Sequence, residues 1–184
     1  DVVYVVAPVE PAAAGAAPHA GAEGESAPLK LTENECSTIG TELVHALTRA
    51  IMGPAPEPAL WEVDANLRPE GKDGPLVRTV ESYVQDHKRW AENWEFQALL
   101  KARPIAGSAQ LGARYARAID PFVWESAGRE SFVESVKAMH ARVTDNIPSH
   151  QVDRQIKLGP GGMRDIEFTV QLLQLVHGRT DTAV

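Results

Sequence analysis

The fold of this 184-residue chain is decided by one stretch, which reads Trp61-Glu62-Val63-Asp64-Ala65-Asn66-Leu67-Arg68-Pro69-Glu70-Gly71-Lys72-Asp73-Gly74-Pro75. Apolar and polar residues alternate over its first half, which predicts a strand whose apolar face is Trp61, Val63, Ala65 and Leu67. Pro69 ends the pattern, and the glycines predict a tight turn after it. A carboxylate held beside an arginine, just before a glycine-bearing loop, suits a metal–phosphate site. An edge strand with a charged, solvated face explains the same spacing, so both interpretations stand at this point.

Composition restricts the class of protein. Hydrophobic residues make up 43% and charged residues 23%, as in ordinary globular proteins. The net charge of −7 argues against a general nucleic-acid binder, because such domains usually carry a basic excess. The single cysteine, Cys36, allows no internal disulfide, and no apolar run approaches the roughly 20 residues of a membrane helix. We therefore expect a cytoplasmic protein with neither a nucleic-acid nor a membrane partner.

The N-terminal part of the chain predicts a strand and a helix. Residues 1–6 are β-branched and aromatic after Asp1, which is typical of a buried strand of the parallel type. Because a protein rarely starts inside a core strand, we expect the chain to be N-terminally truncated. Thr32-Glu33-Asn34-Glu35 predicts a capping box, and the helix that it begins should end near Gly53, with an apolar repeat at Ile39, Leu43, Ala46, Leu47 and Ala50.

The remaining pattern is helical. An apolar stripe from Val80 to Ala98 predicts one helix with Trp90 in the core. A further helix should run from about residue 109 to 119 and end at Pro121, because proline breaks helices. A helical section begins near Glu130, with one amphipathic face formed by Phe132, Val133, Val136, Met139, His140 and Val143. In a last helix over about residues 163–177, we expect Ile166, Val170 and Leu173 to enter the core.

Two more stretches carry long motifs. The first reads Trp94-Glu95-Phe96-Gln97-Ala98-Leu99-Leu100-Lys101-Ala102-Arg103-Pro104, and the second reads Lys157-Leu158-Gly159-Pro160-Gly161-Gly162-Met163-Arg164-Asp165-Ile166-Glu167-Phe168. Together with residues 61–75, they resemble in the same order the signatures of the glutamine synthetase adenylyltransferase/adenylyl-removing enzymes. The resemblance covers most of the chain except about residues 7–28. Three long motifs in order are far more specific than a lone glycine pattern.

The resemblance implies an α+β fold. Residues 1–120 would form a partial nucleotidyltransferase-like domain, a mixed sheet with flanking helices, interrupted by a mobile loop insertion at residues 7–28. Residues 121–184 would begin a helical domain. Asp1 matches the second carboxylate of the family's metal-binding pair and Asp64 the third carboxylate, whereas the first aspartate and the Gly-Ser turn of the family have no counterpart in the chain. We therefore expect the 184 residues alone to be inactive or prone to aggregate.

The site residues follow from the same resemblance. Asp1 and Asp64 would be both catalytic residues and Mg²⁺ ligands. The residues implied to bind nucleotide or phosphate are Arg68, Lys101, Arg103, Lys157, Gly161, Gly162 and Arg164, with Glu95 and Glu167 in support. Simpler explanations exist for some of them. Cations at a helix C-terminus favour the helix dipole, and a glycine turn before a helix is often a plain cap.

The implied reaction is the removal of AMP from an adenylylated tyrosine of glutamine synthetase by phosphorolysis, which gives ADP. Mg²⁺, ATP or ADP and inorganic phosphate would take part, and glutamine synthetase and the PII signal protein would be the partners. Within the family, the motifs at residues 157–168 and 68–76 look more like the N-terminal, adenylyl-removing half. The alternatives are the adenylylating half, which transfers AMP from ATP, and a non-catalytic docking module. A related PII uridylyltransferase is disfavoured, because we expect it to lack the motif that begins at Trp94.

Overall fold

The computed structural model describes residues 1–8, 31–53, 59 and 61–180. The chain divides into two compact units, residues 1–83 and residues 84–184, and each is described here by itself. This boundary falls earlier than the domain boundary near residue 120 that the sequence suggests. The expected loop insertion at residues 7–28 lies outside the described residues from residue 9 onward.

The first unit is built on two parallel strands, β1 (Tyr4–Val6) and β2 (Val77–Thr79). Tyr4 pairs with Val77, and Val6 pairs with Thr79. The expected parallel strand at the N-terminus is therefore confirmed, although β1 is half-buried while Val77 and Thr79 of β2 are buried. The mixed sheet and the nucleotidyltransferase-like fold stay predictions.

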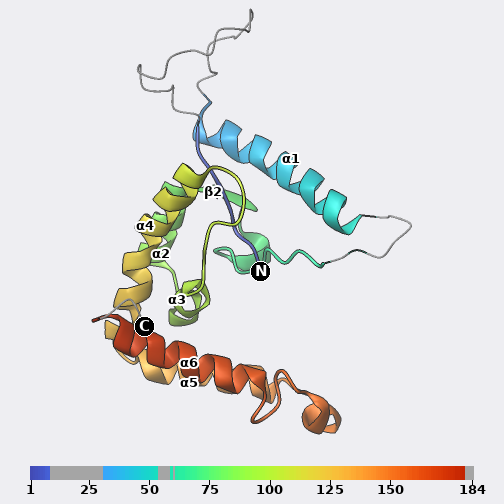
Figure 1. Ribbon diagram of the computed structural model, residues 1–184, viewed down its shortest axis with the longest axis vertical. Helices are drawn as coiled ribbons and strands as arrows, with labels where there is room; N and C mark the ends of the chain where they lie inside the picture. Colours follow the sequence, from blue (N-terminus) through green and yellow to red (C-terminus); the bar gives the residue numbers. More distant parts are fainter. Residues whose placement is uncertain (9–30, 54–58, 60, 181–184) are drawn as a thin grey trace, which may run out of the picture. The chain divides into compact units, whose positions relative to one another are not determined.

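Helix α1 (Glu33–Met52) packs on this pair of strands (Figure 1). Its start is the predicted capping box: the Thr32 hydroxyl accepts a hydrogen bond from the Glu35 backbone N–H, and the Glu35 carboxylate accepts one from the Thr32 N–H. The helix buries Cys36, Gly40 and Val44. The apolar repeat of Ile39, Leu43 and Leu47 is exposed, so it indicated the helix but not its packed face.

The stretch from Trp61 to Leu67 is not a strand, and that prediction is wrong. Within the described ranges, residues 61–65 belong to no strand or helix, and a turn begins at Asn66. The side chains still alternate in their exposure to solvent. The apolar Val63, Ala65 and Leu67 are half-buried, and the polar residues between them, Glu62, Asp64 and Asn66, are exposed. Trp61 is exposed against expectation. A strand needs a neighbouring strand that donates and accepts backbone hydrogen bonds at regular intervals. Among the described residues, one backbone hydrogen bond joins this stretch to the segment before β1, from the Val2 N–H to the Asp64 carbonyl oxygen at 2.7 Å.

The turn that follows the stretch is confirmed. Residues Gly71–Asp73 form a short 3₁₀ helix, η1, which is preceded by Glu70 in the left-handed region (φ 62°). Gly74 allows a close approach, because a Cβ there would collide with the Pro69 carbonyl oxygen. The chain is thereby turned directly into β2, and α2 (Val80–Arg89) starts at the end of that strand.

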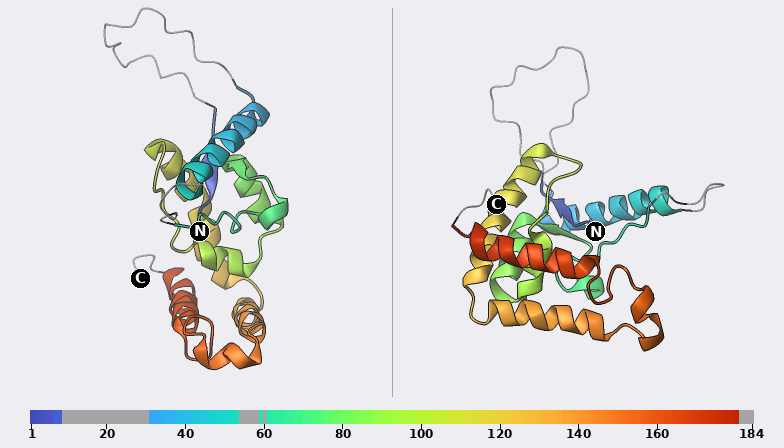
Figure 2. Two further views of the ribbon diagram at one scale, coloured as in Figure 1. Left: turned by 90° about the vertical axis from the view of Figure 1, so that its right-hand side faces the viewer. Right: turned by 60° about the horizontal axis from the view of Figure 1, so that its bottom comes forward.

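The second unit is helical. After the C-terminal part of α2 come α3 (Asn93–Leu99), α4 (Ala109–Glu125), the 3₁₀ helix η2 (Ser126–Gly128), α5 (Phe132–Asp145), the 3₁₀ helix η3 (Ser149–Arg154) and α6 (Met163–Gly178). Helices α5 and α6 lie side by side (Figure 2). Buried Phe132 and Val136 confirm the amphipathic face predicted for α5.

Two predicted boundaries are wrong. The helix predicted from Val80 to Ala98 is broken after Arg89, because Glu92 caps a new helix by accepting the Glu95 N–H, and Trp90 at the break is exposed rather than in the core. Helix α4 runs through Pro121 instead of ending there. A proline inside a helix costs about 3 kcal/mol. Here the same helical face buries Tyr115, Ile119 and Val123 on both sides of an exposed Pro121, and this packing offsets the cost.

The packed face of α6 also differs from the prediction. Ile166, Val170 and Leu173 are exposed, whereas Gln171, Leu175 and Gly178 are buried. Gly178 lies against the ring of Trp124 in α4, so no larger residue fits there. The polar side of α6 turns inward because partner groups on α3 satisfy it, as described below.

Candidate functional site

The two predicted metal ligands lie in neighbouring segments of the first unit. The Val2 N–H donates a hydrogen bond to the Asp64 carbonyl oxygen, which brings the residue next to Asp1 against the backbone of Asp64. Both aspartates are exposed. One carboxylate oxygen of Asp64, Oδ1, accepts the Asn66 N–H at 2.8 Å, which fixes the side chain in a local turn. The role of the two carboxylates as metal ligands stays a prediction.

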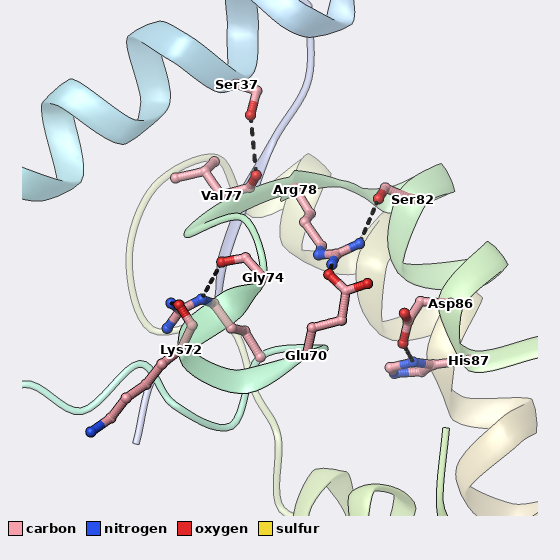
Figure 3. Close-up of polar contacts among 10 residues, drawn as sticks. Ser37, Glu70, Lys72, Gly74, Val77, Arg78, Ser82, Asp86 and His87 are labelled. Carbon is pink, nitrogen blue, oxygen red and sulfur yellow. Dashed lines mark hydrogen bonds and ion pairs between the residues drawn. The ribbon is translucent and has the colours of Figure 1, made fainter. Parts of the chain in front are cut away.

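Arg68 closes the loop in which it lies. Its guanidinium donates hydrogen bonds to three backbone carbonyls, those of Ala65 (2.7 Å), Gly74 (3.2 Å) and Lys72 (3.3 Å). Beside it, the Arg78 guanidinium donates to the Glu70 carboxylate at 2.7 Å and to the Ser82 hydroxyl at 3.2 Å (Figure 3). The loop is therefore held in shape by arginine side chains. Arg68 acts there as a structural residue, and its predicted contact with phosphate stays a prediction.

In the second unit, the two other motifs meet. Glu167 of α6 lies between Lys101, whose Nζ is 4.0 Å from Oε1, and Arg164, whose Nε is 3.9 Å from Oε2. Gln171 donates from Nε2 to Glu167 Oε1 at 3.3 Å. Two cations predicted from two separate motifs, Lys101 and Arg164, are thus brought together at the Glu167 carboxylate. Arg103 and Lys157 are exposed and stay predictions.

The glycine turn before α6 is closed on itself. The Gly161 N–H donates to the Asp165 carboxylate, and the N–H groups of Gly162, Met163 and Arg164 donate to backbone carbonyls of Gly159, Ile156 and Lys157. A helix start binds anions through unoccupied N–H groups. The N–H groups of Gly161 and Gly162 are occupied here, so any anion binding at this turn depends on the side chains of Lys157 and Arg164.

One pair was missed by the sequence reasoning. His140 Nε2 lies 2.7 Å from Asp165 Oδ1, the carboxylate that also receives the Gly161 N–H. The His140 ring meets Phe168 edge-on, with centroids 5.0 Å apart, and the Arg164 guanidinium lies 5.7 Å from the same ring. His140 therefore fastens α5 to the glycine turn. The placement of His140 on an amphipathic face gave no signal for this contact, which depends on how α5 and α6 pack.

Glu95 is set apart by its surroundings. Burial raises the pKa of this carboxyl above its ordinary value, and the nearby Asp86 and Glu92 carboxylates raise it further, although the hydrogen bond from the Glu92 N–H opposes the shift. Glu95 therefore caps the start of α3 through its carboxyl group, and the surroundings disfavour the ionised form of that group. Its predicted supporting role in the site stays a prediction.

Replacing Glu95 by glutamine should stabilise the chain at neutral pH. A raised carboxyl pKa means that the folded state holds the proton more tightly than the unfolded state does, so the contribution of Glu95 to stability is present below the ordinary pKa of 4.5 and lost as pH rises through the folded-state value. Glutamine stays uncharged and can still accept the Glu92 N–H. Thermal unfolding across a pH series should show a higher Tm for E95Q near neutrality and a shrinking difference toward acid. The exposed Glu134 provides the control variant E134Q, and an equal effect of both would contradict the argument.

Among the described residues, no group of three or more His, Cys, Asp and Glu side chains is placed to hold a metal ion. Mg²⁺ often uses one or two protein carboxylates together with substrate phosphates. The hard-oxygen pair of Asp1 and Asp64 fits that smaller ligand set. No helix in the described ranges is long and apolar enough to cross a membrane.

Comparisons with known proteins define the class. Residues 23–118 match the family model of the glutamate-ammonia ligase adenylyltransferases, and residues 137–183 match the GlnD PII-uridylyltransferase model. The chain is 62% identical over 146 residues to the bifunctional glutamine synthetase adenylyltransferase/adenylyl-removing enzyme of Leifsonia xyli subsp. xyli, which covers 79% of this chain. It is 56% identical over 152 residues, or 83% of its length, to the enzyme of the same name from Streptomyces coelicolor.

The chain therefore belongs to the family of bifunctional glutamine synthetase adenylyltransferase/adenylyl-removing enzymes, which confirms the resemblance seen in the three motifs. The matched regions make up 14% and 15% of these two relatives, so the chain spans about one seventh of their length. The shorter match to the uridylyltransferase model is confined to the C-terminal quarter of the chain, after the first two motifs.

Proposed function

We propose that the chain is part of an enzyme that removes AMP from an adenylylated tyrosine of glutamine synthetase by phosphorolysis. The observation that supports this most is the meeting of Lys101 and Arg164 at Glu167, because it gathers cations from two separate motifs in a chain whose relatives carry adenylyl-removing activity in their name. A nucleotide-transfer site needs gathered positive charge more than it needs a covalent nucleophile.

In the proposed reaction, an oxygen of inorganic phosphate attacks the phosphorus of the tyrosine-bound AMP. The bond between that phosphorus and the tyrosine oxygen breaks, the tyrosine leaves with the electron pair, and ADP is formed. Lys101 and Arg164 would neutralise phosphate oxygens, with Arg103 and Lys157 as further cations. In the first unit, Asp1 and Asp64 would be ligands of Mg²⁺, an ion that supplies charge neutralisation when bound.

The adenylylating reaction, in which AMP passes from ATP to the tyrosine, is the second candidate. The same charges suit it, and the names of the relatives contain both activities. We prefer the removing reaction because the motifs at residues 157–168 and 68–76 look more like that half of the family. The nucleotidyltransferase-like fold, the Mg²⁺ requirement, the PII partner and the cytoplasmic location belong to the proposal as predictions.

The test uses the chain within a protein of the length of its curated relatives. It is incubated with AMP-modified glutamine synthetase, Mg²⁺ and phosphate, and ADP release is measured. The variant D64N should lower the rate by about 100-fold or more, because a metal ligand is lost. The control is D73N, since Asp73 is an exposed carboxylate in the same loop region.

Each outcome separates the candidates. ADP that is lost in D64N but kept in D73N supports the proposal and the metal role of Asp64. AMP transfer from ATP to unmodified glutamine synthetase, without ADP release from the modified form, assigns the adenylylating half. The absence of both reactions and of nucleotide binding leaves the docking module.

A further inference from the structure

Two buried amides connect the motif helices of the second unit. Gln97 of α3 is 3% exposed and Gln171 of α6 is 8% exposed. Gln97 Nε2 donates a hydrogen bond to Gln171 Oε1 at 2.9 Å, and Gln171 Nε2 donates to Glu167 Oε1 at 3.3 Å. A continuous path of polar contacts therefore runs from the interior of the unit to Glu167.

The Glu167 carboxylate connects this chain of polar contacts to the two cations. Its Oε1 faces both Gln171 and Lys101, and its Oε2 faces Arg164. All three charged side chains are partly or largely exposed, and ion pairs of this kind contribute little to stability. The arrangement thus sets where the charges lie more than it holds the fold together.

The amide pair is also a poor way to fill a core. Gln97 Oε1 is buried and has no hydrogen-bond partner among the described residues, and a buried acceptor in this state is unfavourable. Replacing both partners of such a pair by apolar residues of similar shape is often neutral or stabilising. Packing alone therefore does not account for two glutamines at these positions.

We propose that Gln97 and Gln171 are positioning residues, which fix Glu167 so that Lys101 and Arg164 face the same phosphate group. The proposal rests on the function proposed above for the site. It assigns to the glutamine in the Trp94 motif and to the glutamine that follows the last motif a role in phosphate recognition without contact with the substrate.

The experiment compares the double variant Gln97→Leu/Gln171→Leu with Gln174→Leu. Gln174 is a matched control, because it lies on α6 and its Oε1 is buried, and within the described part of the chain it makes no hydrogen bond to Glu167. Both readouts use a protein of the relatives' length. The first is thermal unfolding together with the NMR signals of the Arg164 guanidinium and the Lys101 ammonium, and the second is KM for phosphate and kcat.

We expect the double variant to keep the parent Tm and to lose the ordered signals of Arg164 and Lys101. KM for phosphate should rise about tenfold, the effect of losing one hydrogen bond to a charged group, while kcat stays within about twofold. Glu167→Gln should raise KM similarly, and Q174L should change neither constant.

Unchanged signals, or a KM equal to that of Q174L, would overturn the proposal. A fall in Tm well beyond that of Q174L would also overturn it, because the amides would then hold the fold. If the parent protein catalyses neither reaction, the proposed function fails, while the NMR comparison still decides whether the amides position Lys101 and Arg164.

Discussion

Replacing Leu175 with alanine should lower the free energy of unfolding by about 2–5 kcal/mol, the range for truncating a buried leucine. Leu175 is 0% exposed and lies on α6, which contacts α3, α4, α5 and η2. Leu175 is thus fully buried on a helix that packs against four other elements. Because packed helices move inward only partly when an isopropyl group is removed, most of the cavity should remain.

Urea denaturation followed by circular dichroism would measure this loss, and hydrogen exchange in α4 and α6 would locate it. The matched control is L173A, two residues earlier on the same helix, where the leucine is 52% exposed. We expect this substitution to change stability by no more than about 0.5 kcal/mol, as for most surface positions. Similar losses at the two positions would show that α6 packs through its apolar stripe instead.

Replacing Gly40 with valine should destabilise the first unit by about 2–3 kcal/mol through overpacking. A Cβ at residue 40 would lie 2.8 Å from Val6 Cγ1, closer than real Cβ atoms come to a neighbour, and 3.0 Å from Val77 Cγ1, which is tighter than most Cβ contacts. Both neighbours are β-branched residues in the paired strands, and their stiff χ1 angles leave them little room to turn away. Helix α1 would have to separate from the strands.

Hydrogen exchange at the amides of β2, combined with denaturant unfolding, would measure this effect. Ala46 offers the control A46V, since it lies on the same helix, is exposed and receives the same new side chain. Valine is a poorer helix former than alanine but a better one than glycine, so helix propensity alone would make A46V the more destabilising change. A loss of stability in G40V no larger than that in A46V would contradict the close packing of Gly40 on the strands.

Local signals in the sequence predicted local structure well. The capping box at Thr32 and Glu35 places the start of α1, because both of its hydrogen bonds join residues three positions apart. The parallel character of β1 followed from its apolar run. The predictions failed where distant partners decide the outcome. Pro121 stays inside α4 because packing on one face outweighs a local cost, and residues 61–67 pair with no strand of the part that the structure describes.

The site shows the same division. The motifs identified Lys101, Arg164 and Glu167 as members of a site, and the structure brings these three together. The sequence did not predict that Arg68 bonds to its own loop, that the N–H groups of the glycine turn are occupied, or that His140 meets Asp165. Each of these contacts depends on the three-dimensional positions of the donor and acceptor groups. The spacing of residues along the chain does not specify those positions.

The sequence by itself determined the family, the helix start at residue 33, the turn after Pro69 and the members of the charged cluster, because motifs and caps depend on residues close together in the chain. Only the tertiary structure decided which face of α1 and of α6 is packed. Both helices carry an apolar stripe that is exposed and a second face that is buried. In α6 the buried face contains Gln171, because Gln97 satisfies its amide across 74 residues of sequence and Leu175 fills the space beside it. A side chain can be buried where the fold supplies it with packing or hydrogen-bond partners, and the hydrophobic periodicity of one helix does not show where those partners lie.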